Sequence, residues 1–555
     1  MVYLPPGPWL SIVSWISETA LSAKMNLIKE KIIKQKINLA GKVFIVWLIF
    51  FAIFLALHLS VPNFWAADDA YYHAKHAALI AETGDLTLVR PWLAFHFFSY
   101  APTDPWWGYH LIAAGFIKIF GLVLGVKILT SLIAGLVFAS FYYFANKLAA
   151  RRPLVWTMLF FVSSAVFLFR LMLERPFGTA IVILPIAAWL LAQKKYWPLF
   201  ALSIFFTLLY NLAPLIIIFA LAAMLAELYL TRSLNLKPLL ATAAGVLAGI
   251  LLHPASLNYL YVIFMHLWQI LYLKFSGVDL GVGSEIQTIS FLTTIRYNAL
   301  ALTFYFIASA LFFAFAKLRA KLLNLVLFLI SLGWMMLGLV VPRGFDFWLP
   351  LAWMFIVSIF SGFRQLPEHD LIKRFIEKKV NQKVLTAMVI AVIAVVAVNN
   401  LAQFGLNRYD RLNEKRKDEH YAEVADWLKK NTASGEIVFY DDWSYWPQMF
   451  YYNDYNRYVI GIDPTFLYEY DSELFWYWRN ISFYANACGQ ADACADLGPK
   501  VTLARVPMII KERFNSRYAI VANNQERPLT KAMSLNKTAY SQEFENKSFL
   551  LFKIR

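Results

Sequence analysis

The sequence predicts a polytopic α-helical membrane protein of about 11 to 13 transmembrane helices with a C-terminal extracytoplasmic mixed α/β domain. The 555-residue chain is 60% hydrophobic, with a mean hydropathy of +0.54. Only 15% of its residues are charged, whereas about a quarter are charged in soluble domains. Apolar runs that can cross about 30 Å of hydrocarbon recur up to residue 402, after which the composition becomes mixed polar and aromatic.

About eleven apolar stretches are expected to cross the membrane, and the basic residues between them indicate their orientation. With the N-terminus in the cytoplasm, Lys and Arg collect in the cytoplasmic segments. The chain then divides into a cytoplasmic segment over 1–40, a transmembrane domain over 41–402 and an extracytoplasmic domain over 403–555. The expected spans are 41–61, 124–147, 153–170, 177–192, 196–211, 213–231, 238–253, 293–316, 321–341, 344–362 and 384–402.

The net charge of +16 does not indicate nucleic-acid binding, because the basic residues lie in short loops between spans. We expect a multi-pass protein of the plasma (inner) membrane, surrounded by membrane lipids. Two more apolar stretches, 108–120 and 256–275, would invert the charge order if they crossed. We expect both to form amphipathic helices on the outer interface.

The segment after residue 402 is long enough for one small domain. Residues 419–431 have the pattern of an amphipathic helix. Four further runs favour strands: 436–440, 505–510, 517–521 and 548–554.

Cys488 and Cys494 are the only cysteines, and both lie in this domain. A non-reducing compartment and the short separation favour a structural disulfide over two free thiols.

Two neighbouring aspartates, Asp68 and Asp69, follow the first span. Adjacent carboxylates repel each other and are best tolerated beside a divalent cation or a cationic substrate. Most other polar and aromatic residues of this outer loop, 62–123, are expected to be solvated or interfacial. His73 and His76 could suggest zinc, but oxygen ligands favour Mg²⁺ or Mn²⁺.

Three other outer segments carry candidate residues. In the loop 171–177, Glu174 could be a metal or acid–base carboxylate and Arg175 a phosphate ligand, or the two could form a salt bridge within the loop. Glu285, in the loop 254–292, could reach back towards a substrate. Arg343 could snorkel at the outer end of a span or bind the phosphate of a lipid.

The order and sidedness of these pieces resemble the catalytic subunit of oligosaccharyltransferase, of the bacterial and archaeal single-subunit type, within the GT-C superfamily of membrane glycosyltransferases. The resemblance covers about residues 40–465. It rests on the aspartate before Tyr71-Tyr72-His73, the segment 145–153, Arg170, Ser284-Glu285, Arg343, and a helix at 422–432 followed by Asp441-Asp442-Trp443-Ser444-Tyr445-Trp446.

The resemblance implies an inverting transfer of a sugar or glycan from a polyprenyl-phosphate or -pyrophosphate donor. It assigns Asp68, Asp69, Glu174 and Glu285 as catalytic residues, the first three also as metal ligands. Arg343 and Arg175 would hold the donor phosphate, and Trp443, Ser444 and Tyr445 the acceptor.

Two departures from the family bear on the acceptor and the metal. Gly178 and Ala180 stand where the family has an Asp-x-Asp metal motif, and Asp442-Trp443-Ser444 replaces its Trp-Trp-Asp block. The acceptor could therefore be a protein, or instead a lipid or cell-envelope polysaccharide. A transporter or flippase is the other alternative, but transporters place ionisable groups near the midplane, whereas the carboxylates here gather on one face.

Overall fold

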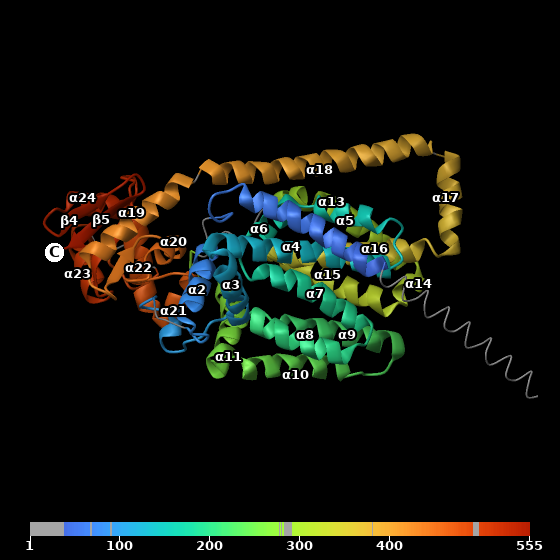
Figure 1. Cartoon of the computed structure of the whole chain (residues 1–555), viewed down its shortest axis with the longest axis horizontal. Coiled ribbons are helices and arrows are strands. Elements are labelled where there is room, and N and C mark those ends of the chain that lie inside the picture. Colours follow the sequence, from blue (N-terminus) through green and yellow to red (C-terminus); the bar gives the residue numbers. More distant parts are fainter. Residues whose placement is uncertain are drawn as a thin grey trace, which may run out of the picture.

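The computed structural model describes residues 38–66, 69–88, 92–276, 278, 280–281, 291–379, 381–413, 415–491 and 499–555. A long helical bundle occupies the centre of the molecule, and a small sheet-containing domain lies at one end (Figure 1). Helices α2 (Asp69–Thr83) and α3 (Trp107–Phe120) lie between the two parts.

The described residues include six helices that are long and apolar enough to cross a membrane, and four shorter apolar helices. The chain is therefore a multi-pass helical membrane protein, as predicted. The long helices are Asn38–Leu59, α4 (Leu122–Lys147), α13 (Phe291–Ala314), α15 (Leu322–Val340), α16 (Gly344–Phe363) and α18 (Gln382–Asn413). The shorter ones are α7 (Phe177–Ala192), α8 (Tyr196–Leu209), α9 (Leu215–Thr231) and α10 (Lys237–Leu252).

The expected single span at 153–170 is broken. It consists of α5 (Pro153–Phe161) and α6 (Ala165–Met172), which meet at an angle of 83°. Ser164 caps α6, because its side chain accepts a hydrogen bond from the N–H of Phe167. Side-chain bonds of this kind satisfy backbone groups that a break would otherwise leave unpaired in a membrane.

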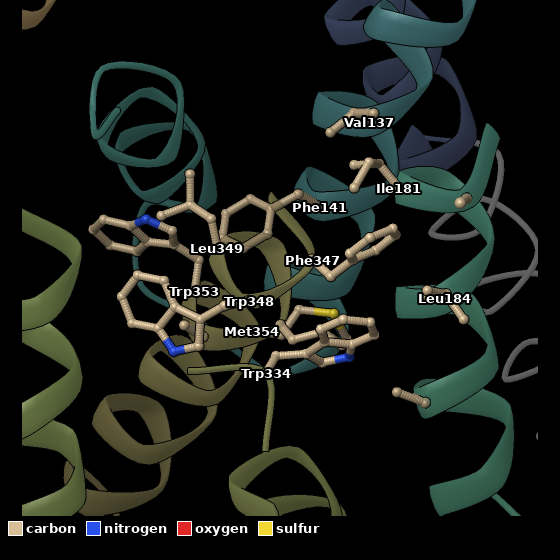
Figure 2. Close-up of a cluster of buried hydrophobic side chains, with 14 of the residues drawn as sticks. Val137, Phe141, Ile181, Leu184, Trp334, Phe347, Trp348, Leu349, Trp353 and Met354 are labelled. Atoms are coloured by element: carbon tan, nitrogen blue, oxygen red, sulfur yellow. The ribbon is translucent and has the colours of Figure 1, made fainter. Parts of the chain in front are cut away.

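Helix α16 forms the centre of the bundle, with 94% of its most apolar 18-residue window buried. Its aromatic side chains meet residues of α4, α7 and α15 (Figure 2). Trp353 also donates its Nε1–H to Oγ of Ser163 at 3.1 Å. Helix α18 is the opposite case, with only 6% of the corresponding window buried, so its apolar side chains face outward as lipid-facing residues do.

Short helices connect these elements. α14 (Ala316–Arg319) and α17 (Pro367–Lys379) flank the α15–α16 pair. The stretch expected as an interfacial helix at 256–275 is helical, as α11 (Ser256–Phe264), a π-helical turn (Met265–Gln269) and α12 (Ile270–Phe275). Large apolar side chains such as Leu257, which is 80% exposed, line its outer face.

The C-terminal domain contains a five-stranded mixed sheet in the order β2-β1-β3-β5-β4. β1 pairs in parallel with β2 and β3, whereas β5 is antiparallel to β3 and β4. The strands are β1 (Ile437–Tyr440), β2 (Arg457–Tyr458), β3 (Ser516–Ala522), β4 (Tyr540–Glu545) and β5 (Phe549–Ile554). The helices are α19 (Lys415–Asn431), α20 (Trp446–Tyr452), α21 (Pro464–Tyr470), α22 (Ser472–Tyr484), α23 (Pro499–Glu512) and α24 (Pro528–Leu535).

The strand expected at 505–510 is wrong, because these residues belong to α23. Val506, Ile509 and Ile510 are buried, which is helical spacing along one face. β2 and β4 were not predicted, since β2 is very short and β4 exposes most of its residues. The helix at 419–431 and the other three strands are confirmed.

The first outer loop packs against the C-terminal domain rather than standing alone in solvent. The Ala94 N–H donates to the carbonyl of Tyr458 at 2.7 Å, and the Tyr458 N–H donates to the carbonyl of Trp92 at 2.8 Å. A parallel bridge pairs Leu93 with Tyr458. Side chains of α2 and α3 belong to the same hydrophobic cluster as the sheet, so the loop and the domain share one core.

Candidate functional site

One pocket lies where several helices begin or end at the same end of the bundle, and its empty space, about 440 Å³, includes a part that is open to solvent. α2 and α16 begin there, α6 ends there, and the α6–α7 and α8–α9 turns border it. The helix ends bring together residues that are far apart in the sequence. The lining residues are Asp69, His73, Trp106, Arg170, Leu173, Arg175, Pro176, Phe177, Tyr210, Arg343 and Asp346.

Three guanidinium groups and two carboxylates give this pocket an excess of positive charge. Nη1 of Arg175 lies 3.4 Å from Oδ2 of Asp69, and Nε of Arg170 lies 3.5 Å from Oδ2 of Asp346. Burial, together with the positive charges of Arg170 and Arg175, lowers the pKa of the Arg343 guanidinium to about 10. Like charges that line one pocket favour an anion between them.

The structure therefore brings together three of the predicted site residues, Asp69, Arg175 and Arg343. Asp69 opens α2, and its side chain is 32% exposed. Asp68 and Glu285, two further predicted catalytic residues, lie outside the described residues.

Glu174 faces away from this group and does not line the pocket. Its carboxylate is fully buried and accepts hydrogen bonds from the N–H of Trp65 at 3.1 and 3.2 Å. Nδ1 of His58 lies 3.1 Å from Oε1 of Glu174. These contacts support a structural role for Glu174, which fixes the turn after the first span, and its assignment as a catalytic and metal-binding residue stays a prediction.

The predicted acceptor residues lie in the C-terminal domain and not in the pocket lining. Trp443 donates its Nε1–H to the carbonyl of Gly281, in the outer loop that precedes α13. Ser444 donates to the carboxylate of Asp442 through both its N–H and its hydroxyl. The ring of Tyr445 packs on Phe549, with ring centroids 5.2 Å apart. Their role towards an acceptor stays a prediction.

Cys488 is disulfide-bonded. Its predicted partner, Cys494, lies outside the described residues, so the pairing itself stays a prediction.

Sequence reasoning missed four groups around the pocket. Trp106, Tyr210 and Asp346 line it, and Asp463 of the C-terminal domain lies within electrostatic range of Arg343. Asp463 accepts a hydrogen bond from the N–H of Thr465 and so begins α21. Their positions in the sequence could have indicated them, because Tyr210 and Asp346 both lie at ends of expected spans, on the same side as the first outer loop.

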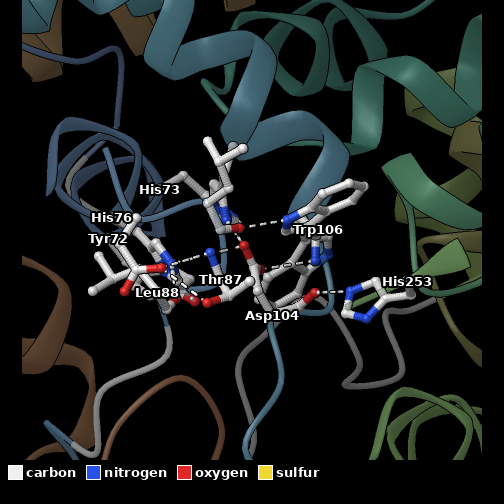
Figure 3. Close-up of polar contacts among 12 residues, drawn as sticks. Tyr72, His73, His76, Thr87, Leu88, Asp104, Trp106 and His253 are labelled. Atoms are coloured by element: carbon white, nitrogen blue, oxygen red, sulfur yellow. Dashed lines mark hydrogen bonds and ion pairs between the residues drawn. The ribbon is translucent and has the colours of Figure 1, made fainter. Parts of the chain in front are cut away.

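A buried network of histidines extends from the pocket into the first outer loop (Figure 3). Nδ1 of His73 lies 2.8 Å from Nε2 of His110, and Nδ1 of His110 lies 2.6 Å from Oδ2 of Asp104. Nε2 of His76 lies 3.7 Å from the same oxygen, and Nε2 of His253 is 3.0 Å from the backbone carbonyl of Asp104. All five side chains are buried, so the expectation of a solvated loop is wrong for the four that belong to the first outer loop, which are His73, His76, Asp104 and His110.

Burial sets the ionisation of this network. It lowers the pKa of His76 to about 4, despite the opposing attraction of Asp104. Burial alone would raise the pKa of Asp104, but His110 and His76 lower it to about 2. Burial and the positive charge of Arg175 hold the pKa of His73 well below its usual value. At neutral pH Asp104 is therefore a carboxylate, and His73 and His76 are neutral.

Of the three residues predicted to bind a metal, Asp68 lies outside the described residues, and the carboxylates of Asp69 and Glu174 both have partners within the protein. Asp69 is paired with Arg175, and the carboxylate of Glu174 is turned towards Trp65. Among the described residues, the one group that offers three close metal-ligand atoms is His76, Asp104 and His110. The expectation of Mg²⁺ or Mn²⁺ accordingly stays a prediction.

No protein-family model and no curated protein matches this chain, but solved structures do. Archaeal oligosaccharyltransferase AglB from Archaeoglobus fulgidus, in complex with an inhibitory peptide and a dolichol-phosphate, has a TM-score of 0.57 at 11% identity, covering 89% of this chain and 72% of that one. The Archaeoglobus fulgidus oligosaccharyltransferase in complex with Zn and sulfate has a TM-score of 0.55 at 11% identity, covering 91% and 73%. ArnT from Cupriavidus metallidurans, bound to undecaprenyl phosphate, has a TM-score of 0.50 at 12% identity, covering 93% and 97%. At these identities the likeness establishes the fold, which is the GT-C, oligosaccharyltransferase-like fold that the sequence resemblance predicted.

Proposed function

We propose that this chain is a membrane glycosyltransferase that moves a sugar or oligosaccharide from a polyprenyl-phosphate or -pyrophosphate donor to an acceptor on the extracytoplasmic face. One observation carries the proposal: a carboxylate, Asp69, and two guanidiniums, Arg175 and Arg343, line the same pocket at one end of the helical bundle. Two solved proteins of this fold hold a dolichol-phosphate or undecaprenyl phosphate, which supports a lipid-linked donor.

The arginines of the pocket would hold the donor phosphate. Arg343 contributes a guanidinium whose charge the two neighbouring arginines disfavour, and a bound phosphate would relieve that repulsion. Guanidinium groups bind phosphate oxygens through paired, charge-assisted hydrogen bonds. The site lies at a bundle end because a polyprenyl carrier stays in the bilayer while its phosphate reaches the surface.

Asp69 would act on the acceptor. The nucleophilic oxygen or nitrogen of the acceptor attacks the anomeric carbon of the sugar from the face opposite the phosphate. The bond between the sugar and the phosphate oxygen breaks, the phosphate leaves with that electron pair, and the configuration inverts. The acceptor gives up its proton, which Asp69 accepts as general base. Asp68 and Glu285 keep their predicted catalytic roles beside this step.

The identity of the acceptor divides the proposal in two. A protein acceptor follows from the oligosaccharyltransferase resemblance. A lipid or polysaccharide acceptor is favoured by the contacts of Asp442. Its carboxylate accepts a hydrogen bond from the N–H of Ser444, and its Oδ2 lies 3.5 Å from Nη2 of Arg527. A carboxylate engaged in this way is less available to read a peptide.

A transfer assay tests the proposal. The full chain in lipid nanodiscs is incubated with radiolabelled undecaprenyl-linked sugar and with peptide, lipid and polysaccharide acceptors. We expect label to move to one acceptor class, and the class separates the two alternatives. Movement of labelled donor between leaflets without any transfer would instead support the flippase alternative and overturn the proposed function.

A further inference from the structure

When His110 is neutral, the hydrogen bonds that connect Asp104 to the pocket leave one arrangement of protons. Oδ2 of the Asp104 carboxylate can only accept a hydrogen bond, so Nδ1 of His110 must donate to it. A neutral His110 then has a lone pair on Nε2, which accepts from Nδ1–H of His73. Nε2 of His73 is therefore unprotonated, and it is the ring nitrogen left for the pocket that His73 lines.

Asp104, at the end of this hydrogen-bonded series that is farther from the pocket, is held in place by several contacts. The other carboxylate oxygen of Asp104 accepts from the N–H of Trp106 at 3.0 Å. The backbone carbonyl of Asp104 contacts Nε2 of His253 at 3.0 Å, which ties the loop to the residue that follows α10. Such bonds hold the carboxylate in one orientation, as an orienting acid holds the imidazole of a nucleophile–histidine–acid triad.

The same cluster has the spacing of a metal site, but its nitrogens are already hydrogen-bonded. Both ring nitrogens of His110 are used, one by Asp104 and one by His73. The ring nitrogens of His76 lie 3.3 Å from the hydroxyl of Tyr72 and 3.0 Å from the carbonyl of Leu88. A metal would have to break these contacts, whereas a hydrogen-bonded relay uses them as they stand.

We propose that His73 is a second proton-handling residue of the transfer pocket, and that His110 and Asp104 are positioning residues that keep its Nε2 ready to take a proton. This inference rests on the proposed function. The proton that Asp69 takes from the acceptor passes on to Nε2 of His73, since both residues line the pocket, and the Nδ1–H of His73 shifts towards His110. The positive charge is then shared along the chain and stabilised by the Asp104 carboxylate. No other reactant is needed.

Donor binding would make His73 a stronger base. The positive charge of Arg175 is one of the causes that hold the pKa of His73 low. A donor phosphate bound to Arg175 would cancel that charge, so the imidazole would accept a proton more readily when the substrate is present.

The first experiment measures the tautomers directly and does not depend on activity. The full chain in nanodiscs, labelled with ¹⁵N in the rings of its nine histidines, is studied by NMR, and His73→Gln and His110→Gln variants assign the signals. We expect His73 and His110 both to carry their proton on Nδ1. An Asp104→Asn variant can donate from its amide and should shift both rings towards the Nε2–H form. A wild-type His73 that carries its proton on Nε2 would overturn the proposal.

The second experiment distinguishes the hydrogen-bonded relay from a metal site, and its failure from the failure of the proposed function. In the transfer assay Asp104→Asn should lower kcat about 10- to 100-fold with an unchanged KM for the donor, while the control Asp85→Asn, in the exposed part of the same loop, keeps the wild-type rate. Stoichiometric metal in the purified protein that is lost in His76→Gln would overturn the relay in favour of a metal site. If the wild-type chain transfers nothing, the proposed function fails, and the tautomers still decide the proton arrangement.

Discussion

Nη1 of Arg175 lies 3.4 Å from Oδ2 of Asp69, and both side chains line the same pocket. The pair joins the loop between α6 and α7 to the first residue of α2. A donor phosphate would compete with Asp69 for Arg175, so that phosphate binding would free the carboxylate for the acceptor. Binding of one substrate would in this way prepare the site for the other.

Replacing Asp69 with Asn should abolish transfer, with a loss of about 100-fold or more, because the amide cannot take a proton. Folding should be unaffected, since the side chain is 32% exposed. Initial rates in the transfer assay and the thermal unfolding midpoint check both statements. Asp454→Asn, which disturbs a pair with Lys75 at 3.5 Å outside the pocket, is the matched control. A folded Asp69→Asn variant with full activity would remove Asp69 from the mechanism.

Replacing Arg343 with Gln should raise the KM for the donor about 10- to 100-fold, because a charged hydrogen bond contributes about 1.5–3 kcal/mol. Arg343→Lys should lie between Gln and wild type, since an ammonium keeps the charge but not the paired geometry. Titration with undecaprenyl phosphate gives the same comparison without turnover. Arg513→Gln, on the exposed pair with Glu473 at 2.9 Å, should leave donor binding unchanged.

Replacing Glu174 with Leu should lower the free energy of unfolding by about 1–3 kcal/mol, because the buried N–H of Trp65 loses its acceptor. Glu174→Gln keeps one acceptor oxygen and should cost less. The thermal unfolding midpoint in detergent measures this difference. If Glu174→Leu were as stable as wild type yet inactive, the sequence assignment of Glu174 as a catalytic residue would be right and the structural role wrong.

Stability should fall as the pH is lowered from about 6.5 towards 5. Burial lowers the pKa of both His76 and His266 to about 4 in the folded protein, whereas an unfolded histidine titrates near 6.5. Between these values the unfolded chain binds more protons than the folded one, so acid favours unfolding. Unfolding midpoints measured across this window check the slope, which should be shallower in His76→Phe. A midpoint that is constant from pH 7 to 5 would contradict the buried, neutral state of these rings.

The spans and the order of the site residues could be read from the sequence because they depend on local features. Hydropathy located most of the helices, and the ends of those helices placed Arg175 and Arg343 on one side. The break before α6 was missed because Ser163 and Ser164 interrupt an apolar run without Pro or Gly to signal it.

The remaining errors come from contacts between distant segments. Asp104 and His110 looked like residues of a solvated loop, yet both are buried beneath α2 and its neighbours. For Glu174, whose catalytic role stays a prediction, only the fold shows that the carboxylate accepts a hydrogen bond from the backbone of Trp65. The segment 505–510 is apolar enough to form either a helix or a strand. In the structure it is part of α23, and Val506 is buried in the same hydrophobic cluster as the sheet.

The backbone bonds between Ala94 and Tyr458 tie together segments that are made far apart in time during synthesis. The sheet and the first outer loop bury their apolar side chains against each other, so neither can finish assembling without its counterpart. The first outer loop can therefore complete this shared core only after the C-terminal strands have been synthesised. The interface between the first outer loop and the sheet is consequently among the last parts of the molecule to form.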